Sequence, residues 1–502
     1  MNELTPISQI SFGTTDGKNE ARNPNFESLF YDGGGYYRKL KEDPLKFLVI
    51  GRKGTGKTIL VRYFQKILLK ERNVCSKFIV AGDFTNEKLN NFDYMKVREE
   101  EREIFWRYVI LKELASLVLK NESGFLNKKH ISQLRNVDSD ITLNLEQLIQ
   151  ENNESLGGSV DIKNTSIEAK ESIKNISTYA TGKYFNKIGE LTESLMNVMK
   201  KAKKRYFLFF DDLDEIKLGS IQSNDGESSV IVLAKLLNDF VTALAYVNDK
   251  LLDIDSGSRI ISTLRKDVAE QMQFYGNNIN KIITDNGINI TWFSTLIKSN
   301  PQQSDLGKLI IHKIKASVEE YKSIDDKKLF DIIFLRPRKK SNPFKFIVER
   351  GFGRPRDVIK YLDIVQDTFL DERRISYSMV RQVQSEYCSW FYSELRNEIN
   401  ILENSKSIVK TIDLIKKNGK VIFNYDGLTA RRKLDEQEFT DIIDLKMDLK
   451  SLFILGAIGN HKKLKNNNPI IEYSYRDGAN NPDFSNNFVV HQALRNYLSI
   501  GE

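Results

Sequence analysis

The octapeptide GRKGTGKT, from Gly51 to Thr58, has residues whose types and spacing suit phosphate chemistry. It fits the pattern G-x-x-x-x-G-K-[ST], in which glycines allow successive backbone N–H groups to converge on a phosphate. Lys57 is placed to reach the β- and γ-phosphates of a nucleotide, and Thr58 to ligate Mg²⁺. We therefore predict that ATP and Mg²⁺ are bound here, by Gly51, Arg52, Lys53, Gly54, Thr55, Gly56, Lys57, Thr58 and Ile59.

A phosphate loop of this kind needs a carboxylate partner, and the segment RYFLFFDDLDEI offers candidates. Tyr206 to Phe210 is an apolar run typical of a buried parallel strand, and Asp211 follows at its carboxyl end, where ligands bind in open α/β sheets. We predict that Asp211 coordinates magnesium and that Asp212 orients or deprotonates the attacking water. Asp214 or Glu215 could share this second role, and the residues do not decide between them.

Two further segments carry groups suited to phosphate. In SRIISTLRKDV, Thr263 and Arg265 come at the end of an apolar strand, where they could contact the γ-phosphate or the lytic water. In RGFGRPRDVIKYLDIVQ, Arg354 and Arg356 lie near a helix start marked by Pro355, and domain movement could carry them to a bound nucleotide. By local features alone, each segment has an equally good structural explanation. The first would be an ordinary strand end, and the second a helix start whose arginines are solvated.

A parallel sheet is the element that would bring these groups to one edge. Apolar runs predict strands at Lys46 to Ile50, at Ser76 to Ala81 and at the two polar-ended segments. From Lys57 onward the apolar residues recur with helical spacing, so a helix N-terminus would point at the phosphates. A helix from Ser229 to about Val247 would join the acidic strand to the next strand.

Composition excludes several classes of protein. There is no run of 18 apolar residues and no basic, apolar-cored leader, so we expect neither a membrane span nor a signal peptide. Cys75 and Cys388 allow no disulfide framework, which predicts a reducing, cytoplasmic setting, and the four scattered histidines argue against a zinc site. The net charge of +8 and the pI near 9.0 permit attraction to nucleic acid but equally fit a basic surface.

The four segments, in this order, resemble the core of origin-recognition-type AAA+ ATPases and of the related STAND NTPases. In that resemblance SRIISTLR is similar to the sensor-1 strand, with Arg265 as the sensor arginine. GRPRD is similar to the sensor-2 or G-x-P region. The resemblance implies an ATPase, and the residue in the place of the usual second acid, a Glu, is Asp212, which favours slow turnover.

The domain organisation that follows has three parts. Residues 1–300 are predicted to form the P-loop ATPase core, with a helical insertion at about 84–204 in which Phe105 and Trp106 belong to the hydrophobic core. Residues 301–372 would form a helical lid with the sensor-2 region, and residues 373–502 a winged-helix-like domain. The predicted fold class is therefore α/β, a P-loop NTPase with helical insertion, lid and winged helix.

Two functions remain open for the terminal domain. It either contacts double-stranded DNA, as such modules do in the origin-recognition group, or packs on the ATPase and holds it shut, as in STAND proteins. We thus expect a nucleotide-dependent switch that hydrolyses ATP to ADP, coupled to DNA or, alternatively, controlling a protein effector, for example in phage defence. A homo-oligomer is compatible with either function.

Overall fold

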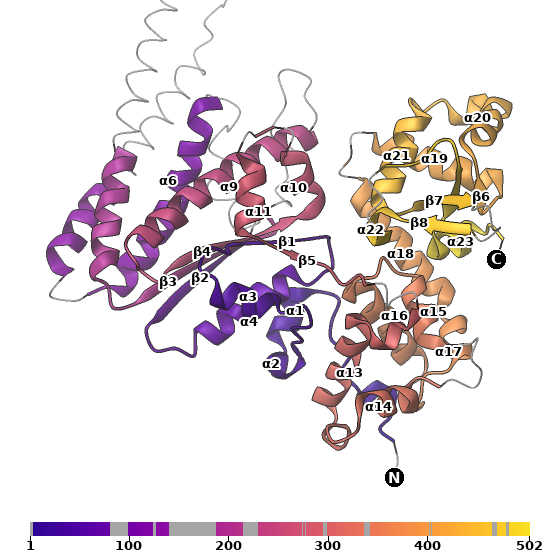
Figure 1. Cartoon of the computed structure of the whole chain (residues 1–502), viewed down its shortest axis with the longest axis horizontal. Helices are drawn as coiled ribbons and strands as arrows, with labels where there is room; N and C mark the ends of the chain where they lie inside the picture. Colours follow the sequence, from indigo (N-terminus) through magenta and orange to yellow (C-terminus); the bar gives the residue numbers. More distant parts are fainter. Residues whose placement is uncertain are drawn as a thin grey trace, which may run out of the picture. The chain divides into compact units, whose positions relative to one another are not determined.

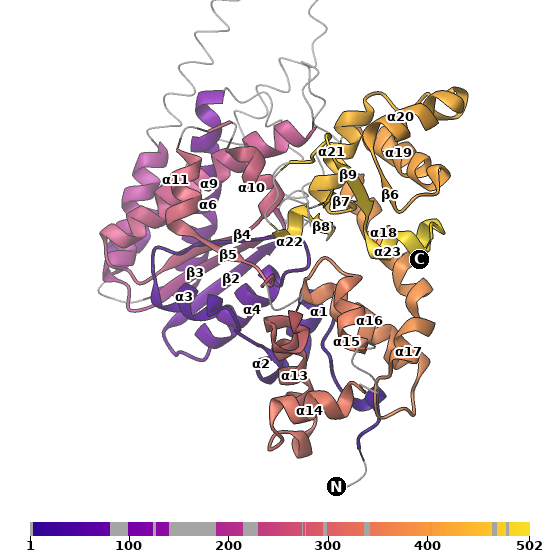
Figure 2. The ribbon, with the colours of Figure 1, turned by 45° about the vertical axis from the view of Figure 1, so that its right-hand side comes forward.

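The chain folds into two compact units (Figures 1 and 2). The computed structural model describes residues 4–80, 99–123, 127–139, 187–213, 229–273, 275–276, 278–294, 299–335, 342–400, 402, 404–463, 469–477 and 481–501. The sheet unit consists of Tyr37–Arg52 and Leu60–Asn289. The lid unit consists of Met1–Tyr36, Lys53–Ile59 and Ile290–Glu502.

A five-stranded sheet organises the sheet unit. Its strand order is β2-β3-β4-β1-β5, and the pairs β2·β3, β3·β4 and β4·β1 are parallel. The strands are β1 (Leu48–Gly51), β2 (Val74–Val80), β3 (Arg205–Asp211), β4 (Arg259–Arg265) and β5 (Gly287–Ile290). Because β1, β3 and β4 are parallel, the ends at which the chain leaves them lie at one edge of the sheet.

Helices cover both faces of this sheet (Figure 1). One face carries α3 (Tyr36–Glu42) and α4 (Lys57–Leu68), and the other carries α6 (Glu99–Asn121), α9 (Ser229–Asp253), α10 (Lys266–Met272) and α11 (Ile279–Asn286). Phe64 of α4 meets Phe207 of β3 edge-on, with ring centroids 6.0 Å apart. Trp106 of α6 is fully buried against Phe240 of α9, which confirms its predicted place in the core.

The arrangement is the α/β fold of P-loop ATPases, and the predicted fold class is confirmed. The loop GRKGTGKT joins the interior strand β1 to the helix α4, as the motif requires. Among the described residues, no helix is long and apolar enough to cross a membrane.

The lid is a cluster of helices that includes part of the N-terminus. Its helices are α13 (Asp305–Ser317), α14 (Asp326–Ile333), α15 (Pro343–Glu349), α16 (Pro355–Thr368), α17 (Tyr377–Gln382) and α18 (Gln384–Ile399). Ile7, Ile10 and Phe12 are buried in the same hydrophobic core. The side-chain amide of Gln366 on α16 donates to the carbonyls of Ile7 and Ile10 and so holds this N-terminal segment on the lid.

The C-terminal module has the element order of a winged helix. It comprises α19 (Ser405–Asn418), β6 (Ile422–Phe423), α20 (Tyr425–Leu434), α21 (Leu445–Leu455), β7 (Ile458–Lys463), β8 (Pro469–Glu472), β9 (Asn487–Val490) and α23 (Gln492–Leu498). The sheet order is β6-β9-β7-β8, with every pair antiparallel. Helix α21 begins at the Asp444 cap and ends at Gly456, whose φ of +84° suits glycine.

One segment departs from its sequence pattern. The alternation in IIEYSYR, residues 470–476, predicts a strand throughout, but β8 ends at Glu472 and a short helix, α22 (Ser474–Asp477), follows. The carboxylate of Asp477 accepts the Tyr473 N–H at 3.0 Å, and the Ser474 hydroxyl donates to the Ile454 carbonyl at 2.9 Å. These two bonds close a turn that the alternation of side chains does not reveal.

Some predictions remain untested. The three-part division stays a prediction, and much of the predicted insertion, including residues 151–172, lies outside the described residues. Two further segments that are rich in basic residues, 336–345 and 460–468, are described only in part. Cys75 and Cys388 are free thiols.

Candidate functional site

In the sheet unit, a threonine on β4 fixes the predicted magnesium ligand on β3. Asp211 is fully buried at the end of β3, and the hydroxyl of Thr263 donates to its Oδ1 at 2.6 Å. Thr263 itself is buried. Its predicted contact with the γ-phosphate stays a prediction, whereas its observed contact gives it a further role, that of orienting the Asp211 carboxylate.

The second acid is set apart from the first by a backbone turn. Asp212 has a φ of +56°, a conformation that aspartate tolerates better than most residues. Its N–H donates to the Thr263 hydroxyl at 3.3 Å, so one threonine contacts both acids. Strained backbone of this kind clusters at functional sites. The other two candidates, Asp214 and Glu215, lie outside the described residues.

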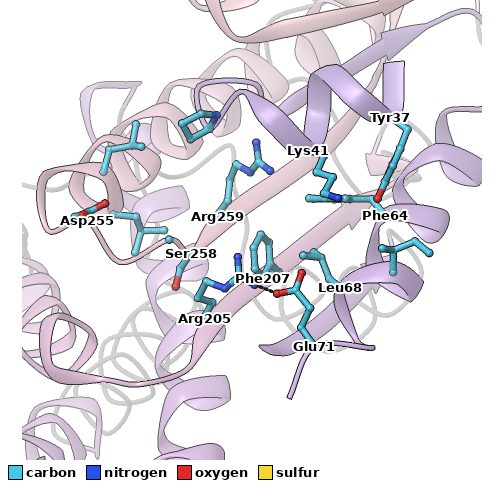
Figure 3. Close-up of a pocket in the computed structure, with 15 residues that line it drawn as sticks. Tyr37, Lys41, Phe64, Leu68, Glu71, Arg205, Phe207, Asp255, Ser258 and Arg259 are labelled. Atoms are coloured by element: carbon cyan, nitrogen blue, oxygen red, sulfur yellow. Dashed lines mark hydrogen bonds and ion pairs between the residues drawn. The ribbon is translucent and has the colours of Figure 1, made fainter. Parts of the chain in front are cut away.

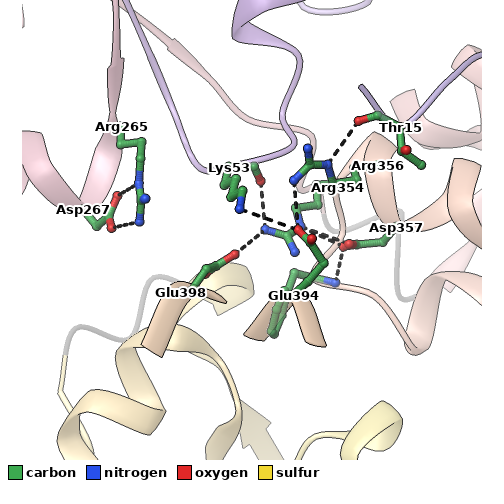
Figure 4. Close-up of polar contacts among 10 residues, drawn as sticks. Thr15, Lys53, Arg265, Asp267, Arg354, Arg356, Asp357, Glu394 and Glu398 are labelled. Atoms are coloured by element: carbon green, nitrogen blue, oxygen red, sulfur yellow. Dashed lines mark hydrogen bonds and ion pairs between the residues drawn. The ribbon is translucent and has the colours of Figure 1, made fainter. Parts of the chain in front are cut away.

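Arg265 is held by an acid two residues away. Its Nε and Nη2 donate to the two carboxylate oxygens of Asp267 at 3.1 and 2.5 Å (Figure 4). Burial alone would raise the pKa of Asp267, but the charge and hydrogen bonds of Arg265, together with Arg52, lower it. Arg265 stands opposite Gly51 in the β1·β4 register, so the guanidinium belongs to the strand end from which the phosphate loop departs.

The phosphate loop itself has the conformation that its glycines predict. Gly54 and Gly56 have φ values of +79° and +92°, and Thr55 and Lys57 are buried. The indole N–H of Trp292 donates to the Thr55 carbonyl at 2.9 Å. Trp292 was not singled out from the sequence, because nothing in its local pattern links it to a loop more than 200 residues away.

The N-terminal segment packs on the start of α4. A Cβ placed on Gly17 would lie 3.1 Å from the Cβ of Thr58 and 3.2 Å from Cγ1 of Ile59. The Asp16 side chain caps the helix α1 (Gly17–Arg22) and accepts from the N–H groups of Lys18 and Asn19. A side chain at position 17 would therefore need Thr58 and Ile59 to move by a few tenths of an ångström.

In the lid unit, Arg354 is buried in a network that includes the phosphate loop. Its Nε donates to both oxygens of Asp357 at 3.0 and 3.1 Å, and its Nη1 donates to the Lys53 carbonyl at 2.8 Å and to Glu398 at 3.2 Å. Although burial disfavours the charged form, Asp357 and Glu398 raise the pKa of Arg354. The ion pairs of Arg354 are costly to break, because removing one partner leaves a buried charge without its counterion.

Arg356 makes one bond to the phosphate loop and two bonds to other segments (Figure 4). Its backbone N–H donates to the Gly54 carbonyl at 3.4 Å, its Nε to the Thr15 carbonyl at 3.1 Å, and its Nη1 to Oε2 of Glu394 at 3.0 Å. Pro355 lies between the two arginines at the first position of α16. The predicted arginines are thus brought to the phosphate loop, and each also contacts a glutamate of α18 that the sequence did not single out.

A separate cavity of about 310 Å³ lies at the amino ends of β3 and β4 (Figure 3). Two of the arginines that line this cavity make structural contacts. Arg205 pairs with Glu71, and the buried Arg259 donates to the carbonyls of Leu40, Asp43 and Lys46. Burial lowers the pKa of Arg259 to about 10. Because β3 and β4 are parallel, this cavity is at the edge opposite Asp211 and is not part of the candidate site.

One family model matches part of the chain. Residues 304–396 match the family described as the FunZ-associated C-terminal helical domain, which here spans α13 to most of α18. Among curated proteins, none matches the chain.

Two solved structures are similar to the chain over nearly its whole length. The Orc1 protein of Aeropyrum pernix, solved in complex with DNA, is 12% identical, with 95% of this chain and 95% of that chain covered and a TM-score of 0.37. A Walker-type ATPase of Pyrococcus abyssi is 15% identical, with 92% and 96% covered and a TM-score of 0.36. The fold assignment rests on the strand order and the phosphate loop of this chain rather than on these likenesses.

Proposed function

We propose that this chain binds ATP, hydrolyses it slowly, and acts as a switch whose arrangement depends on the nucleotide. The observation that carries the proposal is the buried Asp211 carboxylate that Thr263 holds at the end of β3, in the sheet whose strand β1 leads along the chain into GRKGTGKT. An oriented acid and a phosphate-binding loop that follows a strand are the two parts that P-loop hydrolysis requires.

The residues have distinct roles in this proposal. The loop amides and Lys57 hold the phosphates, Asp212 orients the attacking water, and Arg265 stabilises charge on the γ-phosphate after exchanging Asp267 for phosphate. The Thr58 hydroxyl and the Asp211 carboxylate supply hard oxygen donors of the kind that Mg²⁺ prefers. Bound Mg²⁺ would neutralise part of the phosphate charge.

The test is ATP hydrolysis by the purified protein, with Lys57→Ala and Asp212→Asn as variants. Lys57→Ala is expected to lose ATP binding, and Asp212→Asn is expected to bind ATP but to turn it over at least about tenfold more slowly. Wild-type affinity and turnover in Lys57→Ala would refute the assignment.

A specific observation favours a protein partner over DNA for the terminal module. Helix α21 occupies the place of the recognition helix, yet its exposed side includes Met447 and Ile454, and Ile443 just before it is 85% exposed. Base edges are read by polar side chains, whereas exposed apolar residues indicate protein contacts. The neighbouring Lys446 and Lys450 would suit an acidic partner surface.

Adding duplex DNA separates these two candidates. A DNA-coupled ATPase would give a salt-sensitive band shift and stimulated turnover, because phosphate contacts release counterions. For a switch that controls a protein effector, the rate of ATP hydrolysis at low salt is expected to stay the same when duplex DNA is added.

A further inference from the structure

One carboxylate of α18 holds two cations that belong to the phosphate-binding region. Oε2 of Glu394 lies 3.0 Å from Nη1 of Arg356 and 3.8 Å from Nζ of Lys53, the third residue of GRKGTGKT (Figure 4). All three side chains are partly exposed, at 19%, 22% and 28%. Glu394 therefore sits where a phosphate-bearing ligand would compete for the same cations.

We propose that Glu394 is an autoinhibitory latch, which holds Lys53 and Arg356 in the nucleotide-free protein and is displaced when ATP binds. This inference rests on the proposed function. A guanidinium binds carboxylate and phosphate with the same planar fork, so the two anions exclude one another. The triphosphate carries several negative charges against one on Glu394, so bound ATP favours the released state.

The neighbouring network explains why the latch is Glu394 rather than Glu398. Glu398 contacts Arg354, whose side chain is 5% exposed and whose other partner, Asp357, is 1% exposed. A buried pair of this kind is a fixed anchor, because separating it leaves a desolvated charge. The partly exposed contacts of Glu394 are weak because solvent screens them, which makes them reversible.

The position of Glu394 couples the latch to the C-terminal module. Phe391, three residues earlier on the same face of α18, stacks on His491 with ring centroids 5.0 Å apart and an interplanar angle of 7°. Phe391 also contacts Phe352, at 4.6 Å, in the loop that carries Arg354. Release of Glu394 would therefore loosen one contact of α18 next to a cluster that ties the module to the lid, while Glu398 keeps the helix anchored to Arg354.

The experiment compares Glu394→Gln with the matched control Glu386→Gln. Glu386 lies on the same helix and is exposed, with no contact to the phosphate loop among the described residues. For Glu394→Gln we expect ATP to bind about three- to tenfold more tightly. We also expect backbone hydrogen exchange of α18 and of residues 53–59, measured without nucleotide, to rise toward the level that ATP produces in the wild type. Glu386→Gln should match the wild type in both measurements.

Each outcome decides a separate question. Tighter binding without any change in hydrogen exchange would overturn the latch, because it would mean that only a local charge had been removed. Unchanged binding and exchange would overturn it as well, while leaving the ATPase proposal intact if Lys57→Ala still loses ATP. If neither the wild type nor Glu394→Gln binds ATP, the proposed function fails, and the latch with it. Should Glu394→Gln fail to fold, hydrogen exchange of α18 in Lys53→Gln, measured without nucleotide, tests the same contact from the other side and does not depend on ATP affinity.

Discussion

The hydroxyl of Thr263 lies 2.6 Å from Oδ1 of Asp211 on the neighbouring strand and also accepts the backbone N–H of Asp212 at 3.3 Å. One side chain thus sets both the orientation of the first acid and the backbone turn that presents the second. This makes Thr263 a positioning residue. A substitution of Thr263 changes the orientation of the two acids and leaves the acids themselves in place.

Replacing Thr263 by valine should therefore damage turnover more than binding. Valine keeps the shape but removes the hydrogen bond to a charged group, which is worth about 1.5–3 kcal/mol. We expect ATP affinity to stay within about threefold of the wild type and turnover to fall at least about tenfold. Thr263→Ser, which keeps the hydroxyl, is the control, and equal turnover in all three proteins would contradict the role.

Gly54→Ala should weaken the phosphate loop for steric reasons. Gly54 has a φ of +79°, and a Cβ there would lie 2.9 Å from the Cβ of Arg356. An alanine in left-handed backbone costs roughly 1–2 kcal/mol, so we expect a lower melting temperature and weaker ATP binding. Gly189→Ala, in a helix with nothing within 4 Å, should be neutral or stabilising. Indistinguishable melting curves for the two variants would argue against this account.

Asp448→Ala should be the more damaging of two aspartate substitutions in α21. The buried Asp448 carboxylate accepts from Asn404, Ser407 and Thr411 at 2.7, 2.5 and 2.8 Å, which ties α19 to α21. Without this carboxylate the three donors would be buried without an acceptor, which should lower the free energy of unfolding by about 3 kcal/mol. Asp444→Ala removes only the helix cap, at about 1 kcal/mol. Chemical denaturation of both variants tests this order, and equal losses would contradict it.

The stability of the protein should fall in mild acid, partly because of His491. Burial, with the nearby charges of Arg495, Arg476 and Arg350, lowers the pKa of His491 to about 3. Unfolded histidine titrates near 6.5, so the unfolded state binds more protons between these pH values and stability falls as the pH falls. The contribution lost between pH 7 and pH 5 is about 2 kcal/mol.

His491→Asn isolates this effect. Asparagine can still accept the Ala493 N–H that His491 accepts at the start of α23. The variant should be less stable at pH 7, since the stack on Phe391 is lost, yet its further loss from pH 7 to pH 5 should be about 2 kcal/mol smaller than in the wild type. Parallel pH profiles for the two proteins would show that His491 does not titrate on unfolding.

Local patterns were enough to predict four of the five strands of the sheet, all but β5, and the phosphate loop. The run Tyr206 to Phe210 predicted a buried strand, and the structure has β3 at Arg205–Asp211. The eight residues of GRKGTGKT predicted a loop between a strand and a helix, because the glycines and the spacing of this motif suit a phosphate-binding loop. Both signals lie within about a dozen contiguous residues.

The contacts of the site were harder to predict, because they depend on register and on distant helices. Thr263 was predicted to contact phosphate, and only the alignment of β3 with β4 places its hydroxyl on Asp211. Glu394 and Glu398 look like a solvated helix face in the sequence. Only the packing of α18 against Lys53, Arg354 and Arg356 gives them partners. Hydrophobic periodicity does not encode such long-range pairing.

The buried core of the lid unit runs without interruption from Ile7 and Phe12, through α13 to α18, into the C-terminal module as far as Ile500. Neither the lid nor the terminal module therefore has a hydrophobic interior of its own. A fragment that stops at residue 396, where the family match ends, would cut α18 before Ile399 and leave one side of that interior open to water. The two parts should melt in a single cooperative transition, and removing the first twelve residues should lower the temperature of that same transition.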